Sequence, residues 1–299
     1  MPFQDITLTA ADGYTLAATH YTPETPTLHA TTGRPQYIAI GCATAVPRGF
    51  YKRFCEYAAS LGLHAIVADY RGIGDSMPPS GKLNGFVMDY ADWSRYDLAA
   101  VVQYAHERGE VYLVGHSLGG HAIGQLPDPS MLKAAYLCGA GAGWAGWMPA
   151  AERIKVWVLW NVLGPIATTM LGYQPMSKFG IGEDIPLGVY RDWKRWCSFP
   201  RYFFDDPAPD AKAIVQKFDR VRMPVAAAVS LDDLWAPPKS RDAFFSGYTK
   251  TQVDRVDLTP AQLGVQNVGH MGYFRKEVGA ILWPQIMAWL GQHGLQPQS

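Results

Sequence analysis

The sequence lacks an uninterrupted apolar run of the length that spans a membrane. About 18–20 such residues are needed, and the nearest candidate, residues 156–171, contains Asn161, Gly164 and Pro165. The N-terminus has no basic region followed by an apolar run, which predicts no signal peptide. We therefore expect a protein without stable membrane insertion.

Cysteine is scarce, and neither sign of charge is in excess. The 26 basic and 26 acidic residues cancel, so the sequence lacks the positive field expected of a nucleic-acid binder. The four cysteines form no Cys-x-x-Cys pair and no metal-ligand spacing. They are Cys42, Cys55, Cys138 and Cys197. We expect buried, reduced thiols, a cytoplasmic location and no metal site.

Short apolar runs alternate with segments of helical spacing along most of the chain. Such alternation predicts an α/β fold, in which helices cover both faces of a mostly parallel sheet. The chain opens differently, because residues 6–9 and 14–21 flank an Asp-Gly turn and predict an antiparallel hairpin. The parallel strands are expected at residues 36–41, 64–69, 111–116, 134–138, 225–230 and 252–258.

The alternation stops between residues 140 and 218. Six of the ten tryptophans lie there, with helical spacing over residues 150–163 and 190–197. We interpret this segment as a helical cap inserted into one α/β domain, which is formed by residues 1–139 and 219–299. Aromatic side chains suit an apolar ligand pocket, although most of them are expected to form the core of the cap.

Residues 115–119 (Gly-His-Ser-Leu-Gly) match the G-x-S-x-G pattern of a nucleophile elbow. In a chain with 30 glycines this match alone can arise by chance. The expected strand before it and helix after it provide the context that the pattern requires. Larger side chains at the two glycine positions would collide with neighbouring backbone, so the turn strains and exposes Ser117. The backbone N–H of Leu118 is then free to bind a developing oxyanion.

A serine hydroxyl needs a general base, and the base needs a third group to hold its tautomer. In elbow architectures these partners follow in the order Ser, Asp or Glu, His. Asp232 and Asp233 come directly after an expected strand, and His270 lies in a loop after a later strand. Each residue alone fits an ordinary loop position. Together, in the required order, they predict a catalytic triad with Ser117.

The chain resembles the α/β-hydrolase superfamily, in its serine aminopeptidase and monoacylglycerol lipase-like branch. Residues 69–76 are similar to the family segment D-x-R-G-x-G-x-S, and residues 268–274 resemble its histidine loop. Residues 233–237 resemble the acid loop D-x-x-x-P, which favours Asp233 over Asp232. The resemblance covers nearly the whole chain outside the insertion and implies the α/β-hydrolase fold with its triad.

One loop departs from the family pattern. The family has His-Gly after its first parallel strand, and the next residue donates the second oxyanion N–H. Here Cys42 and Ala43 take the His-Gly positions, which makes Thr44 the donor; a gap in the alignment would make it Ala43. We interpret Cys42 as a small buried residue.

The sequence predicts a serine hydrolase that cleaves a carboxylic ester with an apolar acyl or aromatic group, without a cofactor. Ser117 is the expected nucleophile, His270 the base and then the acid, and Asp233 the group that orients His270. A serine at the elbow disfavours a dehalogenase. The small-molecule substrate and the oligomeric state stay open.

Several alternatives share this scaffold. Thioester hydrolysis, acyl transfer and aminopeptidase action use the same triad. An aminopeptidase needs a cap carboxylate to hold the substrate's amine, and residues 183–184 and 205–206 are candidates. The alternative from another class is a receptor that binds its ligand without turnover.

Overall fold

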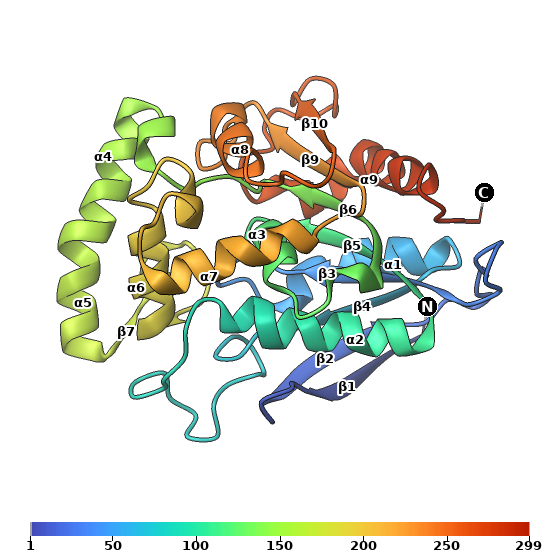
Figure 1. The fold of residues 1–299 in the computed structure, drawn as a ribbon, viewed down its shortest axis with the longest axis horizontal. Coiled ribbons are helices and arrows are strands. Elements are labelled where there is room, and N and C mark those ends of the chain that lie inside the picture. Colours follow the sequence, from blue (N-terminus) through green and yellow to red (C-terminus); the bar gives the residue numbers. More distant parts are fainter. Residues whose placement is uncertain (1, 299) are drawn as a thin grey trace.

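The computed structural model describes residues 2–298, and its centre is one eight-stranded sheet (Figure 1). Across the sheet the strand order is β1-β2-β4-β3-β5-β6-β9-β10. Their bounds are β1 Phe3–Thr9, β2 Thr15–Tyr21, β3 Gln36–Gly41, β4 His64–Ala68, β5 Glu110–His116, β6 Leu132–Cys138, β9 Val225–Ser230 and β10 Val253–Leu258. All six parallel strands expected from the sequence are present.

The first two strands form the predicted antiparallel hairpin. Phe3 pairs with Tyr21 at its open end and Thr9 with Thr15 at its turn, where Gly13 has a φ of 86°. Strand β2 is also antiparallel to β4, whereas every pair from β4 to β10 is parallel. The carboxyl ends of β3, β5, β6, β9 and β10 therefore meet at one edge of the sheet.

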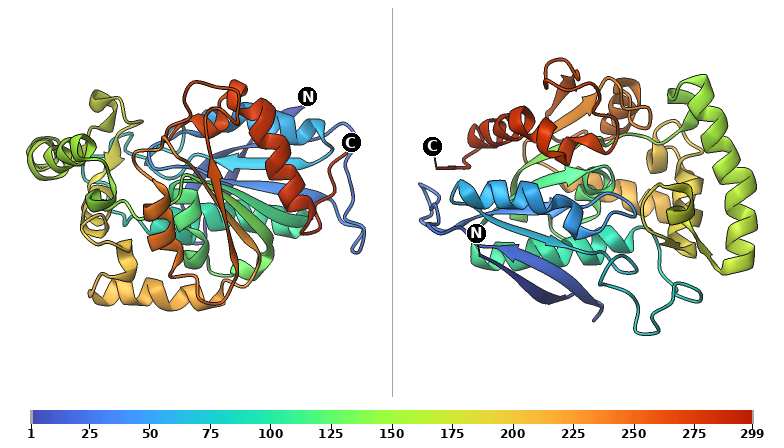
Figure 2. Two further views of the ribbon diagram at one scale, coloured as in Figure 1. Left: turned by 90° about the horizontal axis from the view of Figure 1, so that it is seen from above. Right: turned by 180° about the vertical axis from the view of Figure 1, so that it is seen from behind.

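Helices cover both faces of this sheet. Helix α1 (Lys52–Ser60) contacts α9 (Lys276–Gly291) on one face, and α2 (Ala99–Arg108) lies on the other (Figure 2). A six-residue π-helical segment, Trp93–Leu98, leads into α2. Helix α8 (Pro238–Phe245) links β9 to β10. This is the α/β architecture that the alternating pattern predicts.

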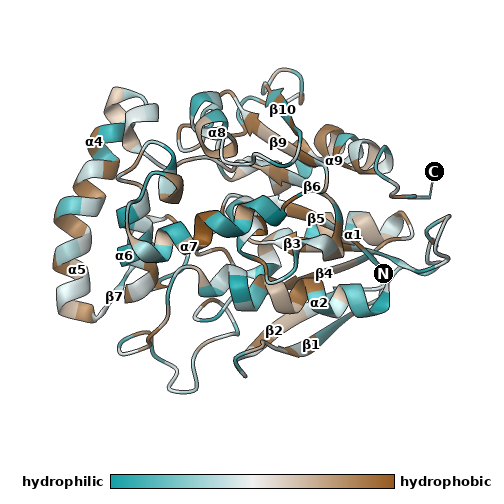
Figure 3. Ribbon diagram, in the orientation of Figure 1, coloured by the Kyte–Doolittle hydropathy of each residue, from teal (hydrophilic) through white to brown (hydrophobic). Residues whose placement is uncertain are grey.

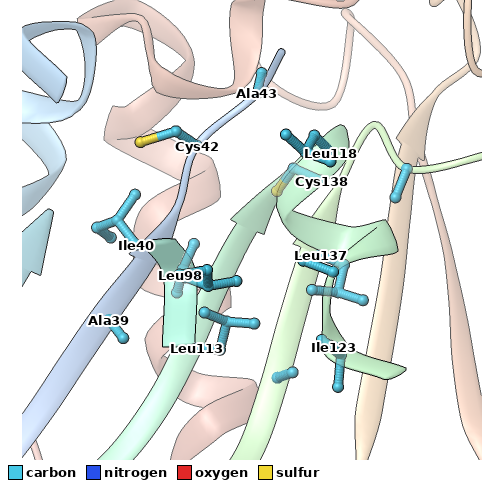
Figure 4. Packing of buried hydrophobic residues seen from close by; sticks show 14 of the residues in the cluster. Ala39, Ile40, Cys42, Ala43, Leu98, Leu113, Leu118, Ile123, Leu137 and Cys138 are labelled. Carbon is cyan, nitrogen blue, oxygen red and sulfur yellow. The ribbon is translucent and has the colours of Figure 1, made fainter. Parts of the chain in front are cut away.

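The core lies along the central strands. Every residue of β3, β4, β5 and β9 is buried, and Figure 3 shows apolar residues concentrated there. Buried side chains of three neighbouring strands cover both faces of the sheet here: Leu113 and Leu137 lie on one face and Ile40 on the other (Figure 4). The four cysteines are all buried and unpaired, as the sequence predicts.

The segment between β6 and β9 is mainly helical and adds no strand to the main sheet. Much of it lies beyond one end of the sheet, at the left of Figure 1. It contains α4 (Ala150–Val158), α5 (Gly164–Leu171), α6 (Leu187–Trp196), α7 (Pro209–Lys217) and a two-stranded ladder of β7 (Tyr173–Gln174) and β8 (Ile185–Pro186). Its assignment as a cap over residues 140–218 stays a prediction.

Helical spacing predicts a helix over residues 150–163, and the structure extends this helix to Leu171, past Gly164 and Pro165. Helix α4, the π-helical segment Leu159–Leu163 and α5 form one continuous 22-residue helix, Ala150–Leu171. A wide π turn can accommodate the missing N–H of a following proline. By length and composition alone this helix could cross a membrane, and 28% of its apolar 18-residue window is buried in the fold.

Candidate active site

The elbow joins β5 to α3 (Leu118–His121) through a strained residue. Ser117 has a φ of 50° and a ψ of −108°, which lies in a region that residues other than glycine rarely adopt. This confirms the strained turn predicted from the sequence. Helix α3 has only four residues, so the exposed N–H of Leu118 matters more here than a helix dipole.

Two glycines allow the elbow to approach the sheet closely. A Cβ on Gly119 would lie 2.2 Å from the carbonyl oxygen of Gly41, the last residue of β3. A Cβ on Gly115 would lie 2.9 Å from the carbonyl oxygen of Gly119. Both contacts are with backbone that has little room to move, so the predicted collisions are confirmed.

Asp233 and His270 reach Ser117 from the ends of two other strands. Asp233 follows β9, and His270 lies in the loop that follows β10. The imidazole Nδ1 of His270 is 2.9 Å from Asp233 Oδ2, and its Nε2 is 3.0 Å from Ser117 Oγ. The structure thus places the three predicted residues in one hydrogen-bonded chain.

The two titratable members of this chain, Asp233 and His270, shift each other's pKa. Burial raises the pKa of Asp233, but the charge and hydrogen bond of His270 outweigh this, and the net pKa is lowered. Backbone N–H groups of Trp235 and Ala236 also donate to Asp233 Oδ1, each over 2.9 Å. Burial lowers the pKa of His270, whereas Asp233 raises it, and the net pKa is raised.

Asp232 has a different position from its neighbour. Its carboxylate accepts hydrogen bonds from the backbone N–H of Val268 at 2.9 Å and of Gly269 at 3.1 Å. Asp232 therefore holds the loop that carries His270, while Asp233 contacts the imidazole itself. This geometry agrees with the preference for Asp233 that the resemblance implied.

The loop after β3 presents one free amide towards the site. The N–H of Ala43 donates to the Tyr51 hydroxyl over 2.7 Å, and the N–H of Cys42 donates to the Tyr70 hydroxyl over 3.1 Å. The N–H groups of Thr44 and Leu118 donate no hydrogen bond within residues 2–298. This favours Thr44 over Ala43 as the second oxyanion donor.

Cys42 is buried, as expected. It is only 1% exposed, its thiol lies 3.5 Å from the carbonyl oxygen of Ala68, and burial raises the thiol pKa well above its usual value. A thiol held in its neutral form is a poor nucleophile. Cys42 therefore supports the packing of the loop, as the sequence interpretation proposed.

A cavity of about 280 Å³ opens above Ser117 and His270. Two tryptophans form part of its wall, Trp193 from α6 and Trp235 from the loop after β9, with ring centroids 6.2 Å apart. The remaining lining residues are small or apolar apart from Thr44. They are Ala43, Thr44, Gly180, Ile181, Gly182 and Met271. Residues 180–182 and Trp193 come from the insertion, as the cap hypothesis requires.

The four acidic residues of the insertion that were candidates for holding an amine are engaged elsewhere. Glu183 accepts a hydrogen bond from the N–H of Gly74 over 2.7 Å, and Asp184 accepts from Ser177. Asp205 binds the N–H of Arg201, and Asp206 pairs with Arg195. None of these four carboxylates, and no other acidic side chain, is among the residues that line the cavity.

Sequence reasoning missed several residues of the site. Tyr273 donates from its hydroxyl to Asp233 over 3.0 Å, and Tyr51 holds the loop of Ala43. Tyr273 follows His270 by three residues, so its place in the histidine loop was a usable signal. Tyr51 had none, because its contact depends on how the 3-10 helix Arg48–Tyr51 packs against the loop after β3. Among residues 2–298 no cluster of three or more His, Cys, Asp or Glu side chains could hold a metal ion.

Comparisons with known proteins agree with this architecture. A family model described as "Alpha/beta hydrolase family" matches residues 40–278. The fold is similar to a thermophilic esterase from Thermogutta terrifontis (18% identity, TM-score 0.55, covering 98% of this chain and 100% of that one). A monoacylglycerol lipase of Paleococcus ferrophilus is also similar (15% identity, TM-score 0.57, covering 93% and 99%). So is a puromycin hydrolase (19% identity, TM-score 0.59, covering 97% and 38%).

The chain belongs to the alpha/beta hydrolase family, because the family model covers well over half of its length. No curated protein sequence matches the chain. At identities this low the similar structures establish the fold alone. Family membership supports a hydrolase that acts on a small molecule. The fold hosts many chemistries, so the reaction must be argued from the site.

Proposed function

We propose that this protein is a serine hydrolase that cleaves an uncharged carboxylic ester through an acyl-enzyme. The observation that carries the proposal is the hydrogen-bonded chain from Ser117 through His270 to Asp233 at the floor of the cavity. A nucleophile, a base and an orienting carboxylate in hydrogen-bond contact are what acyl transfer to serine requires.

In the first half-reaction Ser117 Oγ attacks the ester carbonyl carbon while its proton passes to His270 Nε2. The negative charge of Asp233 stabilises the imidazolium that forms. Two amides, of Thr44 and Leu118, donate hydrogen bonds to the carbonyl oxygen as it becomes an oxyanion. Nε2–H then protonates the departing alkoxide, which leaves as an alcohol, and the acyl group stays on Ser117.

The second half-reaction repeats these steps with water. His270 Nε2 removes a proton from a water molecule as its oxygen attacks the acyl carbonyl, and the same two amides bind the second oxyanion. When the tetrahedral intermediate collapses, His270 returns the proton to Ser117 Oγ. The carboxylic acid is released, and the enzyme returns to its starting state.

The cavity favours a compact and uncharged acyl or aromatic group. Its volume of about 280 Å³ lies at the small end of ligand pockets. Trp193, Trp235, Ile181 and Met271 offer apolar surface, and a charged group buried against them would lack a partner. Thr44 adds one hydroxyl, which already binds Tyr90.

The alternatives differ in how well this site supports them. Aminopeptidase action has no support here, because no carboxylate lines the cavity to hold an ammonium group. Thioester hydrolysis and acyl transfer need the same groups as ester hydrolysis, so they stay open. A receptor without turnover stays the alternative of another class, and a cytoplasmic location stays a prediction.

Hydrolysis of p-nitrophenyl esters of graded acyl length tests the proposal. We expect the wild type to show a chain-length optimum among short or aromatic acyl groups, and Ser117→Ala to lose about 10⁴-fold or more in kcat. Ser198→Ala, which removes an exposed hydroxyl on the insertion, is the matched control and should keep full activity. A wild type as inert as Ser117→Ala towards all esters and thioesters would contradict the proposal.

A further inference from the structure

His116, the residue before the proposed nucleophile, is fully buried and has two polar partners. Its Nδ1 lies 3.1 Å from the hydroxyl of Tyr51, and its Nε2 lies 2.8 Å from the backbone carbonyl oxygen of His270. The sequence suggested only that this side chain points away from Ser117. Instead it contacts the loop that carries the proposed base.

The direction of each hydrogen bond in this group is fixed by chemistry. A carbonyl oxygen can only accept, so Nε2 of His116 must carry a hydrogen and donate it to His270. Burial and the neighbouring His270 lower the pKa of His116 to about 3, so the ring is neutral at neutral pH. Its Nδ1 therefore has no hydrogen and accepts one from the Tyr51 hydroxyl.

The Tyr51 hydroxyl has a second partner in the loop after β3. Because its hydrogen points to His116, its oxygen is free to accept the N–H of Ala43 over 2.7 Å. Three bonds thus run in one direction, from Ala43 through Tyr51 and His116 to His270. One end fixes the residue before Thr44, and the other end fixes the backbone of the proposed base.

Aromatic packing holds the imidazole in this orientation. The ring of Phe274 lies 5.3 Å from it, and that of Tyr273 lies 5.9 Å away, centroid to centroid. Both residues belong to the short 3-10 helix Gly272–Phe274 that follows His270. The same imidazole therefore contacts the histidine loop through a hydrogen bond and through aromatic packing.

We propose that His116 and Tyr51 are positioning residues that couple the oxyanion loop to the histidine loop. Neither side chain lines the cavity, so neither contacts substrate. They set the distance between the amide of Thr44 and the imidazole of His270. Both groups must act on the same ester, the amide on its carbonyl oxygen and the imidazole on the proton that passes from Ser117 to the leaving oxygen. This inference rests on the proposed function, since it assigns these residues a role in that reaction.

Tyr51→Phe is the first test, because it removes one oxygen and with it two of the three bonds. A displacement of about 1 Å in a catalytic group costs about 10²-fold in rate. We expect kcat to fall about 10- to 100-fold while KM stays within about threefold, since the substrate cavity is unchanged. Affinity for a trifluoromethyl ketone, which forms a tetrahedral adduct with serine, should fall by the same factor as kcat.

Tyr112→Phe is the matched control. Tyr112 lies in β5 like His116, and its buried hydroxyl has no hydrogen-bond partner within residues 2–298. Its loss should leave kcat, KM and ketone affinity unchanged. If Tyr51→Phe keeps kcat within about twofold of the wild type and lowers only the thermal stability, Tyr51 is merely structural and the inference is wrong.

A double-mutant cycle tests the coupling. His116→Gln can place an amide N–H near the position of Nε2 and keep the bond to His270, while it has no acceptor at the position of Nδ1, which Tyr51 contacts. We therefore expect it to resemble Tyr51→Phe, and the double variant to lose little more than either single variant. If instead the losses in kcat of the two single variants multiply in the double variant, the two residues act independently and the proposed chain is overturned.

Nitrogen-15 NMR of the histidine rings separates this inference from the proposed function. We expect a neutral Nε2–H tautomer of His116 over about pH 5 to 8, and a shift of the His270 ring signals in Tyr51→Phe. If the expected His116 tautomer and the shift in Tyr51→Phe are both observed, yet the wild type cleaves no ester, the coupling stands and the proposed reaction fails. If the wild type cleaves esters but the His270 signals do not move, the coupling fails.

Discussion

Asp233 determines how the proposed base titrates. The imidazole of His270 must be neutral to accept a proton, and the carboxylate raises its pKa above the ordinary 6.5. Activity should therefore rise with pH through this raised pKa and be lost below it. Burial alone would lower the pKa of His270. The acid limb of the pH profile, the pH range over which activity is lost on acidification, therefore reports the contact with Asp233.

Asp233→Asn tests this assignment. Without the carboxylate the lowering effect of burial remains, so we expect the acid limb of kcat/KM to move to lower pH. The plateau should fall about 10⁴-fold, because an amide does not hold the imidazole in its reactive tautomer. The measurement is a pH profile of kcat/KM from about pH 5 to 9. An unchanged limb would mean that another group orients His270.

At the scale of residues, the triad could be predicted because each member follows a strand within a recognisable motif. The choice between Ala43 and Thr44 could not, since it depends on the hydroxyl of Tyr51 in a neighbouring turn. The contacts of His116 with Tyr51 and His270 could not be predicted from the sequence either. Local patterns identify residue types at fixed spacing, whereas hydrogen bonds between loops depend on how the elements pack.

At the scale of elements, Asp232 connects the end of β9 to the histidine loop. It lies beside Asp233, yet its carboxylate binds the N–H groups of Val268 and Gly269. Charged acceptors make the stronger hydrogen bonds to backbone amides. Asp232 thus holds the loop that carries His270, and Asp233 holds the imidazole of His270 itself.

Asp232→Asn should separate these two roles. We expect a loss of about 1–2 kcal/mol in the free energy of unfolding, because one charged acceptor is replaced by a neutral group. The rate kcat should fall about tenfold as the loop loosens, while the acid limb of the pH profile stays in place. Denaturant unfolding and the same pH series, run beside Asp233→Asn, make the comparison. A shifted limb would assign Asp232 to the imidazole as well.

The strands were predicted more closely than the helices of the insertion. Residues 36–41 match β3 at both ends, because a strand buried on both faces is a continuous apolar run between turn residues. Helical spacing predicted a helix over residues 150–163, but the helix continues to Leu171, past Gly164 and Pro165, which usually end helices. A π turn, which has no clear sequence pattern, carries the helix through them.

At the scale of the whole molecule, the sequence predicts the number of parallel strands but not their order by itself. Strand β3 lies between β4 and β5, so the chain folds back on itself before the elbow is made. That order brings Gly41 against Gly119 and the oxyanion loop beside Ser117. Only the folded chain shows that residues 180–182 of the insertion reach the cavity.

Three buried histidines make the whole fold sensitive to acid. Burial lowers the pKa of His116 to about 3, and the pKa values of His64 and His121 to about 4. In the unfolded chain they return to about 6.5. Between these values the unfolded state binds more protons than the folded state, so stability falls as the pH falls. His270, with its raised pKa, partly offsets this trend.

We expect each of the two fully buried histidines, His116 and His121, to remove about 2 kcal/mol from the free energy of unfolding when the pH falls from 7 to 5. His121→Gln tests one of them, because an amide can still donate to the carbonyl of Gly141, which Nε2 contacts over 2.8 Å. Its stability should depend less on pH than that of the wild type, by about 2 kcal/mol over this interval. The measurement is guanidinium unfolding at both pH values, with the loop variant His29→Gln as control. Equal slopes in the wild type and His121→Gln would show that His121 takes up its proton without unfolding.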